Sequence, residues 1–400
     1  MTTGVHALVP SRRPLGLPVL EDLPPVGGHR VLVRADLNVP LRHNEDDGYE
    51  VADDFRIRSS VPTLEWLTTN GAHVTVCSHL GRPKGKIDPR YSMSPVRKAM
   101  SASLPGVEVM ENLRFDPGEE ANDPEYVKRL VEGFDFYVND AFGSSHRSHG
   151  SIVGPPALLP SAAGRLLQLE VEALSRILFD PARPFVAVIG GAKVADKLGV
   201  LRSLAERVDH LLIGGAMCFT FLAALGHEVG SSHVEPELLE DARALLQAHP
   251  EIILPSDLVA MGMNGPGSVT GSSRLFGADL QPGWQGTDIG PETRADFARA
   301  IENASTVLWN GPMGVFEDPR FAAGTLAVAR AIAKSPAFSV VGGGDTAAAL
   351  DGFGLQADVN HISTGGGATL ELLEKGDLPG LAALRKSDSV ARHLAKADRR

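Results

Sequence analysis

The second half of this chain repeats one device four times: an apolar, β-branched run passes directly into paired or tripled glycines. The four copies are VAVIGGAK, LLIGGAM, SVVGGGDT and HISTGGGAT. A glycine turn between a strand and a helix lets backbone N–H groups approach an anion at the helix N-terminus. In open α/β sheets such turns lie beyond the carboxyl ends of the strands. The device therefore predicts parallel sheet with a ligand-binding edge.

The first half shows the same alternation of strands and helices. Buried strands are indicated by RVLVRADL, AHVTVCSHL and DFYVNDA. Residues 55–71 have apolar side chains at helical spacing and end on Gly71, a typical helix terminator. Because 400 residues exceed one ordinary core, we predict an α/β protein of two doubly wound, Rossmann-like parallel-sheet domains.

The domain boundary is predicted within residues 161–184, where an apolar helix is followed by Asp180-Pro181 and Pro184. We expect an N-terminal domain over residues 1–165, a connecting helix over 166–182 and a C-terminal domain over 183–377. Residues 378–400 form a charged final segment.

Composition narrows the classes of partner. A formal net charge of −11 argues against nucleic acid and against an anionic membrane surface. No apolar run approaches the roughly 20 residues of a membrane helix, and the first residues lack the apolar core of a secretion signal. Cys77 and Cys218 lie in apolar stretches, so we expect buried structural thiols and a reducing compartment, the cytoplasm.

Arginines and histidines gather in short loops of the first half. Arginine forks bind carboxylates and phosphates at two points, although any single surface arginine is usually only solvated. Asp36 and Asn38 stand at alternate positions of a strand end and so point the same way. The spacing of His146 and His149 also allows a metal site, but no third ligand cluster supports it. The loops carry Arg34, Arg56, His79, Arg82, Arg114, His146, Arg147 and His149.

The glycine turns of the second half carry charged neighbours. Lys193 and Lys197 are four residues apart, which would place two ammonium groups on one helix face for a polyphosphate. Asp345 follows three glycines and would hold Mg²⁺ beside phosphate, or alternatively cap an ordinary helix. Glu317 would bind ribose hydroxyls or be a solvated loop residue. Neither a Walker A loop nor a GxGxxG fingerprint is present in the sequence.

One half thus suits a small anion and the other a nucleotide, which favours phosphoryl transfer between them. The segments that carry these residues, in this order, resemble the phosphoglycerate kinase family, and the likeness runs from about Arg30 to Leu384. Its motifs are VRADLNVP, SHLGRPKG, ENLRF, NDAFGSSHRSH, GGAKVADK, DIGPET, WNGPMGVFE, GGGDT and STGGGAT.

The resemblance implies an enzyme of glycolysis and gluconeogenesis that transfers a phosphoryl group between 1,3-bisphosphoglycerate and Mg-ADP, giving 3-phosphoglycerate and ATP. It implies two domains facing across a hinged cleft, with residues 378–400 returning to the N-terminal, phosphoglycerate-binding domain. The partners are small-molecule substrates, the cofactor is Mg²⁺, and we expect a monomer.

The resemblance also implies roles for individual residues. Arg56 would contact the moving group, Asp345 would lie near the metal, and Gly365, Gly366 and Gly367 would cap the helix that receives transition-state charge. Phosphoglycerate would be bound by Asp36, Asn38, Arg56, His79, Arg82, Arg114 and Arg147. The nucleotide would be bound by Lys193, Lys197, Asn310, Glu317, Gly343, Gly344, Asp345 and Thr346, with Lys197 also catalytic.

The sequence departs from the family pattern in three places. Residues 95–111 lack room for a further strand and helix that usually precede ENLRF, Ala216 replaces a usual third glycine, and the ends are extended. Ala216 would either crowd an adenine pocket or stiffen its turn. These departures leave open a specialised paralogue that phosphorylates a related carboxylate or phosphonate. A non-catalytic nucleotide-binding protein and a dinucleotide oxidoreductase are the remaining alternatives.

Overall fold

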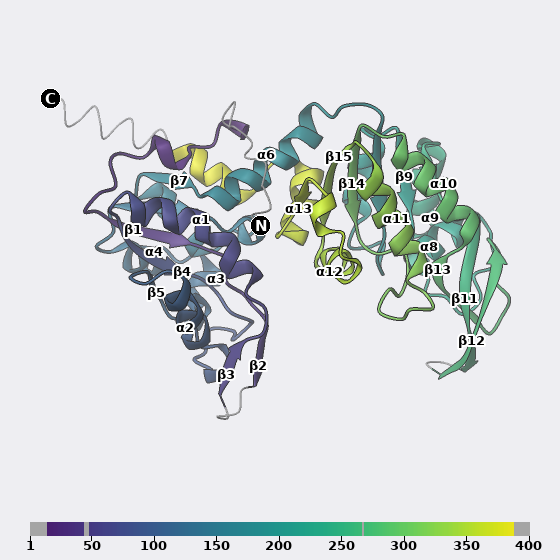
Figure 1. Ribbon diagram of the computed structural model, residues 1–400, viewed down its shortest axis with the longest axis horizontal. Coiled ribbons are helices and arrows are strands. Elements are labelled where there is room, and N and C mark those ends of the chain that lie inside the picture. The colour runs from purple at the N-terminus through teal and green to yellow at the C-terminus, as the bar shows by residue number, and fades with distance from the viewer. Residues whose placement is uncertain (1–13, 44–47, 266–267, 388–400) are drawn as a thin grey trace. The chain divides into compact units, whose positions relative to one another are not determined.

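The computed structural model describes residues 14–43, 48–265 and 268–387, and its chain forms two compact units (Figure 1). The first unit contains the described residues up to Ser175 together with those from Asp377 onward. The second unit is Arg176–Gly376. Each unit has its own parallel sheet, so the predicted α/β class is confirmed.

The first unit is built on a five-stranded sheet in the order β5-β4-β1-β6-β7, with every pair of neighbours parallel. β1 is the central strand, and its Val31, Leu32 and Val33 are fully buried, as expected for a parallel strand covered on both faces. A separate antiparallel pair is formed by β2 and β3. The bounds are β1 (Arg30–Arg34), β2 (Leu41–His43), β3 (Tyr49–Val51), β4 (His73–Cys77), β5 (Glu108–Val109), β6 (Phe136–Asn139) and β7 (Ser161–Ala163).

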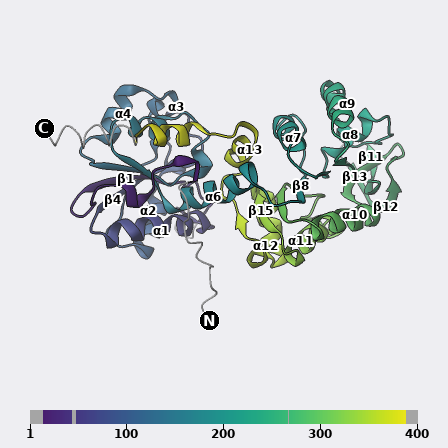
Figure 2. The ribbon, with the colours of Figure 1, turned by 90° about the horizontal axis from the view of Figure 1, so that it is seen from above.

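Helices cover both faces of this sheet. Figure 2 shows α1 on one side of β1 and β4, and α3 and α4 on the other. The α1 helix ends with Asn70 as its cap, and Gly71 follows at φ +81°, a left-handed conformation that suits glycine. The helices are α1 (Phe55–Thr69), α2 (Ser94–Ser103), α3 (Pro117–Ala121), α4 (Pro124–Val131), α5 (Gly150–Val153) and α6 (Arg165–Phe179), with 3₁₀ turns η1 (Pro14–Gly16), η2 (Leu20–Asp22), η3 (Pro89–Tyr91), η4 (Leu113–Phe115), η5 (Phe142–Ser144) and η6 (Pro155–Ala157).

The second unit has a six-stranded parallel sheet in the order β10-β9-β8-β14-β15-β16. Its central strands β8 and β14 are buried along their whole length. The strands are β8 (Phe185–Ile189), β9 (His210–Ile213), β10 (Ile252–Ile253), β14 (Thr306–Asn310), β15 (Phe338–Gly342) and β16 (His361–Ile362).

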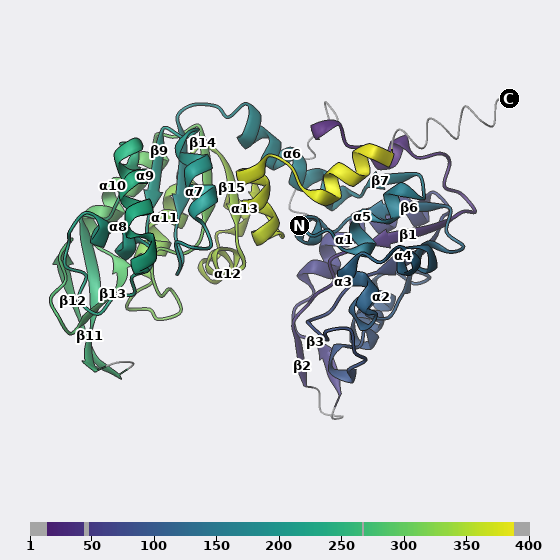
Figure 3. The same ribbon diagram turned by 180° about the vertical axis from the view of Figure 1, so that it is seen from behind.

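The helices of the second unit lie on opposite faces of its sheet. Figure 2 shows α7, α8 and α9 on one side and α10, α11 and α12 on the other, while α13 packs beside α7 (Figure 3). The helices are α7 (Leu198–Ala205), α8 (Cys218–Ala224), α9 (Leu239–Ala248), α10 (Pro291–Glu302), α11 (Ala323–Lys334), α12 (Gly344–Phe353) and α13 (Gly366–Lys375), with 3₁₀ turns η7 (Pro236–Leu238) and η8 (Gln356–Asp358).

Strand order locates the binding edge of each unit. The chain runs outward from β1 through β4 to β5 and then resumes on the other side with β6, so the order reverses between β1 and β6. The corresponding reversal in the second unit lies between β8 and β14. Ligands of open α/β sheets bind beyond the carboxyl ends of the strands at such a switch point.

An antiparallel sheet in the second unit was not predicted. The order is β12-β11-β13, with β11 (Asp257–Gly265), β12 (Ser268–Gly277) and β13 (Trp284–Ile289). Pro255 separates the two-residue β10 from β11, because proline has no N–H for a ladder bond.

The short stretch of residues 95–111 holds α2 and the two-residue edge strand β5. The first unit accordingly has five parallel strands where the second has six. Residues 379–387 are helical, and Leu381 and Leu384 are fully buried. Figure 3 shows this segment in yellow beside β7, where Gly380 N–H donates to the Ser145 carbonyl at 2.9 Å.

Cys77 and Cys218 are free and buried, as predicted. Burial raises the pKa of the Cys77 thiol to about 12, so this thiol stays protonated at neutral pH. Within the described ranges, no helix has the length and apolar character needed to cross a membrane.

Candidate functional site

A cluster of charged and polar residues lies at the switch point of the first unit. Asp36 and Asn38 follow β1, and Arg56 stands in the first turn of α1. Arg56 Nη1 lies 2.5 Å from Asp36 Oδ2. Burial alone would raise the pKa of the Asp36 carboxyl, but the charge of Arg56, reinforced by that of Arg34, holds it below its usual value. Asp36 is therefore a carboxylate that orients Arg56.

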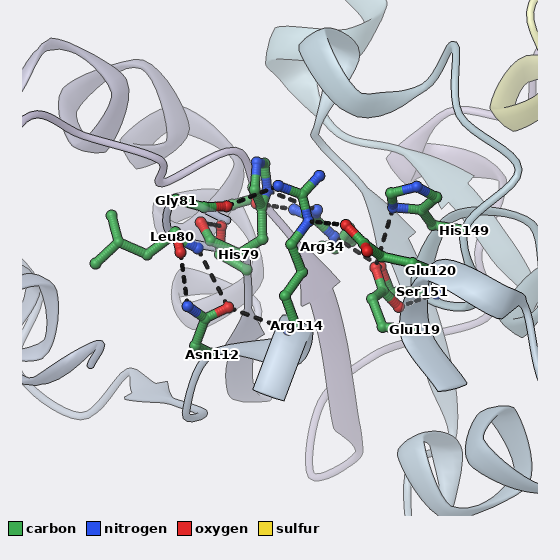
Figure 4. A network of polar contacts seen from close by, with 12 residues as sticks. Arg34, His79, Leu80, Gly81, Asn112, Arg114, Glu119, Glu120, His149 and Ser151 are labelled. Atoms are coloured by element: carbon green, nitrogen blue, oxygen red, sulfur yellow. Dashed lines mark hydrogen bonds and ion pairs between the residues drawn. The ribbon is translucent and has the colours of Figure 1, made fainter. Parts of the chain in front are cut away.

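Three hydrogen bonds shape the loop from His79 to Arg82. Asn38 Oδ1 accepts from Gly81 N–H at 2.8 Å, and Arg114 Nη1 donates to the Gly81 carbonyl at 2.7 Å. Asn112 Nδ2 donates to the Leu80 carbonyl at 2.7 Å. Figure 4 shows Asn112 and Arg114 converging on this loop. Predicted site residues from three separate segments are thus joined in one network.

The predicted phosphoglycerate residues differ in exposure. His79 and Arg114 are buried, Arg147 is half-buried and Arg82 is exposed. Arg114 and Arg147 both act electrostatically on His79, which places the three side chains near one another. The structure therefore brings Asp36, Asn38, Arg56, His79, Arg114 and Arg147 to one region and leaves Arg82 as an exposed cation on the same loop.

Several residues that hold this network had no role predicted from the sequence. No local sequence signal marks Asn112, Glu119 or Ser151, because their contacts join segments far apart in the chain; Glu119 and Ser151 are 32 positions apart. Ser151 N–H and Oγ donate to the two oxygens of the Glu119 carboxylate at 2.8 and 2.6 Å. His149 Nδ1 lies 3.9 Å from Glu119 Oε1. Among the residues that the structure describes, His, Cys, Asp and Glu form no cluster of three or more suited to a metal ion.

The second unit places its glycine turns around a cavity of about 320 Å³. At Gly215, φ is +67° and an added Cβ would lie 2.5 Å from the Gly191 nitrogen, so only glycine fits there. Residues from the turns after β8, β9, β14 and β15 meet at this cavity, whereas the turn of residues 364–369 contributes none, and polar side chains stand among apolar ones. Its lining includes Gly191, Ala216, Phe219, Met313, Glu317 and Asp345.

Lys197 occupies the switch point between β8 and β14. Its Nζ donates to the Gly190 carbonyl at 2.5 Å and to Asn310 Oδ1 at 2.8 Å. Burial lowers the pKa of Lys197 to about 8, against the opposing charges of Asp345 and Asp196. The ammonium is thus held among carbonyl oxygens beside the cavity.

The prediction that Lys193 and Lys197 share a helix face is wrong. The α7 helix begins only at Leu198, with Lys197 as its N-cap. The Glu235 carboxylate accepts from the N–H groups of Val194 and Ala195 and fixes a turn in place of the expected helical turn. Lys193 precedes that turn and is exposed.

Asn310 and Thr346 frame the end of β14. The Asn310 amide Nδ2 is buried without a hydrogen-bond partner in the described part of the chain, as expected of a donor meant for a ligand. Thr346 is fully buried, and its Oγ1 accepts from Gly311 N–H at 2.8 Å. Thr346 therefore fixes the turn after Asn310.

Two helix N-termini meet beside Asn310. Gly343, at φ +95°, caps α12, and Gly365 caps α13. An added Cβ at Gly366 would lie 3.4 Å from the Gly343 Cα, so the two turns touch backbone to backbone. The N-terminal N–H groups and the positive ends of both helices therefore lie close together, an arrangement that suits an anion. The exposed carboxylate of Asp345 stands in the first turn of α12.

Each unit carries a set of polar residues at its switch point, and the second unit adds two helices capped by glycine. Together these features define an α/β phosphotransferase. Residues 20–110 and 104–376 match the sequence model of phosphoglycerate kinase. A phosphoglycerate kinase of Thermus thermophilus is 51% identical over 395 residues, which cover 91% of this chain and 99% of the relative. That of Frankia alni is 48% identical over 399 residues, with 91% and 99% covered. The chain belongs to the phosphoglycerate kinase family, and it is a kinase whose acceptor is a carboxyl group.

Solved structures of phosphoglycerate kinases are also similar to this chain. A phosphoglycerate kinase structure from Coxiella burnetii has a TM-score of 0.84 at 37% identity, covering 92% of this chain and 99% of that chain. One from Pyrococcus horikoshii has a TM-score of 0.81 at 31% identity, covering 93% and 100%.

The comparisons also bear on the short stretch before Glu111. The two segments matched by the family model overlap at residues 104–110, inside that stretch. The alignment with the Thermus protein is 395 positions long, but only 91% of this 400-residue chain takes part in it. The relative therefore has residues without a counterpart in this chain. The overlap of the two matched segments places residues missing from this chain near α2 and β5.

Proposed function

We propose that this chain catalyses reversible phosphoryl transfer between the acyl phosphate 1,3-bisphosphoglycerate and Mg-ADP, giving 3-phosphoglycerate and ATP. The observation that carries the proposal is the Lys197–Asn310 pair, which lies at the switch point of a glycine-lined cavity and retains an unused buried amide donor. A phosphate chain supplies the oxygens that this donor lacks.

The first unit would hold the acid. Arg114, Arg147 and Arg82 supply charge for its phosphate, and the Arg56–Asp36 pair lies where β1 ends and α1 begins. The ion pair with Asp36 fixes the direction of the Arg56 side chain before substrate binds. Arg56 therefore loses little conformational freedom on binding. We assign Arg56 to the transferring group and the other cations to the acid.

The second unit would hold the nucleotide. Lys197, Asn310 and the backbone N–H groups of Gly343, Gly344 and Thr346 suit the phosphates, and Glu317 suits ribose hydroxyls. Mg²⁺ commonly takes one or two protein carboxylates together with phosphate oxygens and waters. The exposed Asp345 carboxylate at the cavity fits this requirement. When bound, the ion would neutralise charge on the phosphate oxygens.

The reaction needs no covalent enzyme intermediate. A carboxylate oxygen of 3-phosphoglycerate bonds to the γ-phosphorus of ATP while the bond to the β,γ-bridging oxygen breaks, and ADP leaves with that electron pair. Charge on the equatorial oxygens is met by Arg56, by Lys197 and by the N–H groups of Gly365, Gly366 and Gly367. Water would hydrolyse the mixed anhydride, so we also propose that the two units close around the substrates before transfer.

A coupled assay tests this function. ATP-dependent phosphorylation is measured across 3-phosphoglycerate and related carboxylates and phosphonates, with kcat/KM compared between acids. Preference for 3-phosphoglycerate is expected; preference for an analogue would identify a specialised paralogue. Titration with ADP and NAD separates the remaining classes, because a kinase binds Mg-ADP and an oxidoreductase binds NAD. We further propose a cytoplasmic monomer, which cell fractionation and sedimentation would test.

A further inference from the structure

Arg34 is the last residue of β1, and its side chain contacts His79 of the charged cluster in the first unit. Its side chain is buried, with 1% of its surface exposed. Nη2 lies 3.2 Å from Nδ1 of His79, and Nε donates to Ser151 Oγ at 2.9 Å. Nη1 donates to the carbonyl of Ala35. Each nitrogen of the guanidinium thus faces a protein acceptor, as Figure 4 shows for the labelled partners.

A second buried charge holds Arg34 in place. Ser151 accepts from Arg34 and donates its own hydroxyl to Glu119 at 2.6 Å, and Glu119 is fully buried. The Tyr137 hydroxyl donates to the Ser151 carbonyl at 2.6 Å and fixes the backbone at that point. The guanidinium and the carboxylate are therefore linked through one hydroxyl, which compensates charge that burial would otherwise make costly.

The contact to His79 determines the state of the imidazole. A guanidinium only donates hydrogen bonds and does not lose its proton in proteins. Nδ1 of His79 must therefore be the acceptor, and the proton of the neutral ring must reside on Nε2. A proton on Nδ1 would face the N–H of Arg34.

We propose that Arg34, anchored through Ser151 to Glu119, is a positioning residue that keeps His79 as the neutral Nε2–H tautomer, so that this N–H is presented to the anionic acid. The inference rests on the proposed function for the identity of that acid. It assigns to Arg34 no contact with the substrate. Binding of the acid by His79 then depends on a hydrogen bond and not on an imidazolium charge.

The surroundings of His79 act in the same direction. Burial lowers the pKa of His79 well below its usual value; Asp36, after β1, opposes this, and the cations Arg34, Arg114 and Arg147 reinforce it. These groups come from β1 and its following loop, from η4 and from the loop after η5. The acid site therefore keeps one protonation state of His79 across neutral pH.

The first experiment needs no variant. Nitrogen NMR of histidine-labelled, ligand-free protein, with the His79 signal identified by its loss in His79→Gln, reports the tautomer directly. Protonated Nε2 and unprotonated Nδ1 between about pH 6 and 8 are expected from the pKa of a histidine lowered by burial. An Nδ1–H tautomer or an imidazolium at neutral pH would overturn the proposal.

The second experiment compares Arg34→Met with Ser151→Ala and with Arg58→Met, an exposed arginine on α1 that pairs with Asp54. In Arg34→Met the KM for 3-phosphoglycerate should rise about tenfold or more, the size expected for a hydrogen bond to a charged group. The KM for ADP should change less than about twofold. The effect of Ser151→Ala should be smaller in the same direction, and Arg58→Met should resemble the parent.

The pH profile distinguishes positioning from general damage. Without Arg34, His79 should become protonated as pH falls toward its ordinary pKa, and kcat/KM for 3-phosphoglycerate should then acquire a new titration step. An Arg34→Met protein that is folded but keeps the parental tautomer and pH profile would refute the proposal. Absence of any 3-phosphoglycerate turnover in the parent would instead refute the proposed function, since the tautomer is measured without substrate.

Discussion

The Nζ of Lys197 lies 2.8 Å from Oδ1 of Asn310, while Nδ2 of the same Asn310 has no partner within the described ranges. Lys197 thereby fixes the orientation of the Asn310 amide, so that the amide Nδ2 points away from the lysine. The ammonium of Lys197 and the N–H₂ group of Asn310 therefore lie side by side at the end of β14 in the ligand-free protein.

Lys197→Met should lower kcat by about 10²–10³-fold, the size seen when one donor to transition-state charge is removed. Lys193→Met is the matched control, because Lys193 is four residues away but exposed. Its effect should stay within about threefold, as for an ordinary surface charge. Steady-state kinetics in both substrates measures the difference, and equal losses in the two variants would contradict the separate roles.

Nucleotide affinity should decline above about pH 8. Burial lowers the pKa of Lys197 to about 8, so the free protein loses this positive charge as pH rises through that value. Bound phosphate favours the protonated form, and the Kd for ADP should therefore rise, by up to about tenfold per pH unit well above the pKa. Calorimetric titration from about pH 7 to 9.5 tests this. Lys197→Arg, which stays charged, should show a much flatter profile.

Arg56→Ala should reduce kcat by roughly 10³-fold or more, in line with single arginines of other phosphoryl-transfer enzymes. The Kd for ADP should remain within about twofold, because Arg56 belongs to the first unit and the residues proposed to bind the nucleotide belong to the second. Arg58→Ala is the control on the same helix. Near-normal kcat in Arg56→Ala would remove Arg56 from the transfer step.

Ala216→Gly tests the residue that replaces a usual glycine. The Ala216 side chain lines the cavity. Removing its methyl and adding backbone freedom should cost about 0.5–1 kcal/mol, so ADP binding should weaken about two- to fivefold. The KM for 3-phosphoglycerate should not change. Tighter ADP binding in the variant would mean that the methyl crowds the nucleotide.

Asp140→Asn should stabilise the protein at alkaline pH. Burial raises the pKa of Asp140 to about 7, despite N–H groups of Leu166 and Leu167 that face Oδ1. The raised pKa means that the contribution of Asp140 is fully present below about pH 4 and is lost as pH rises through about 7. Asn retains the acceptor without the charge, so its advantage should reach about 1–4 kcal/mol above that pH.

Urea unfolding from about pH 5 to 9 measures that advantage. Asp135→Asn provides a control of opposite sign, since the Asp135 carboxyl accepts from Arg30 N–H and its pKa is lowered. A constant difference between Asp140→Asn and the parent across this range would contradict the buried, protonated state of Asp140.

The elements that sequence predicted well have strong local signals. β1, β6 and β8 contain continuous apolar runs, β4 alternates valine with threonine, and glycine turns marked strand ends in the second unit. The Lys193–Lys197 prediction failed because a distant carboxylate, Glu235, holds the backbone in a turn. The Thr346 hydroxyl accepts a hydrogen bond from Gly311 N–H, which follows another strand, and the sequence did not indicate this contact. Spacing alone does not reveal contacts between segments so far apart in sequence.

Arg34 is a further residue whose role the sequence alone did not reveal. Sequence placed it among the loop arginines of an anion site, whereas the structure buries it as the last residue of β1. An arginine that binds a ligand and one that supports a ligand residue look alike in the chain. Burial and the identity of its acceptors separate them.

Residues 377–387 belong to the first unit, yet they are translated only after the whole second unit. Leu378, Leu381 and Leu384 are almost fully buried there, so the core of the first unit lacks these three side chains until then. At ~5–20 residues per second the delay is roughly 10–40 s. The first unit, although begun earlier, therefore completes its apolar interior only after the second unit has been synthesised.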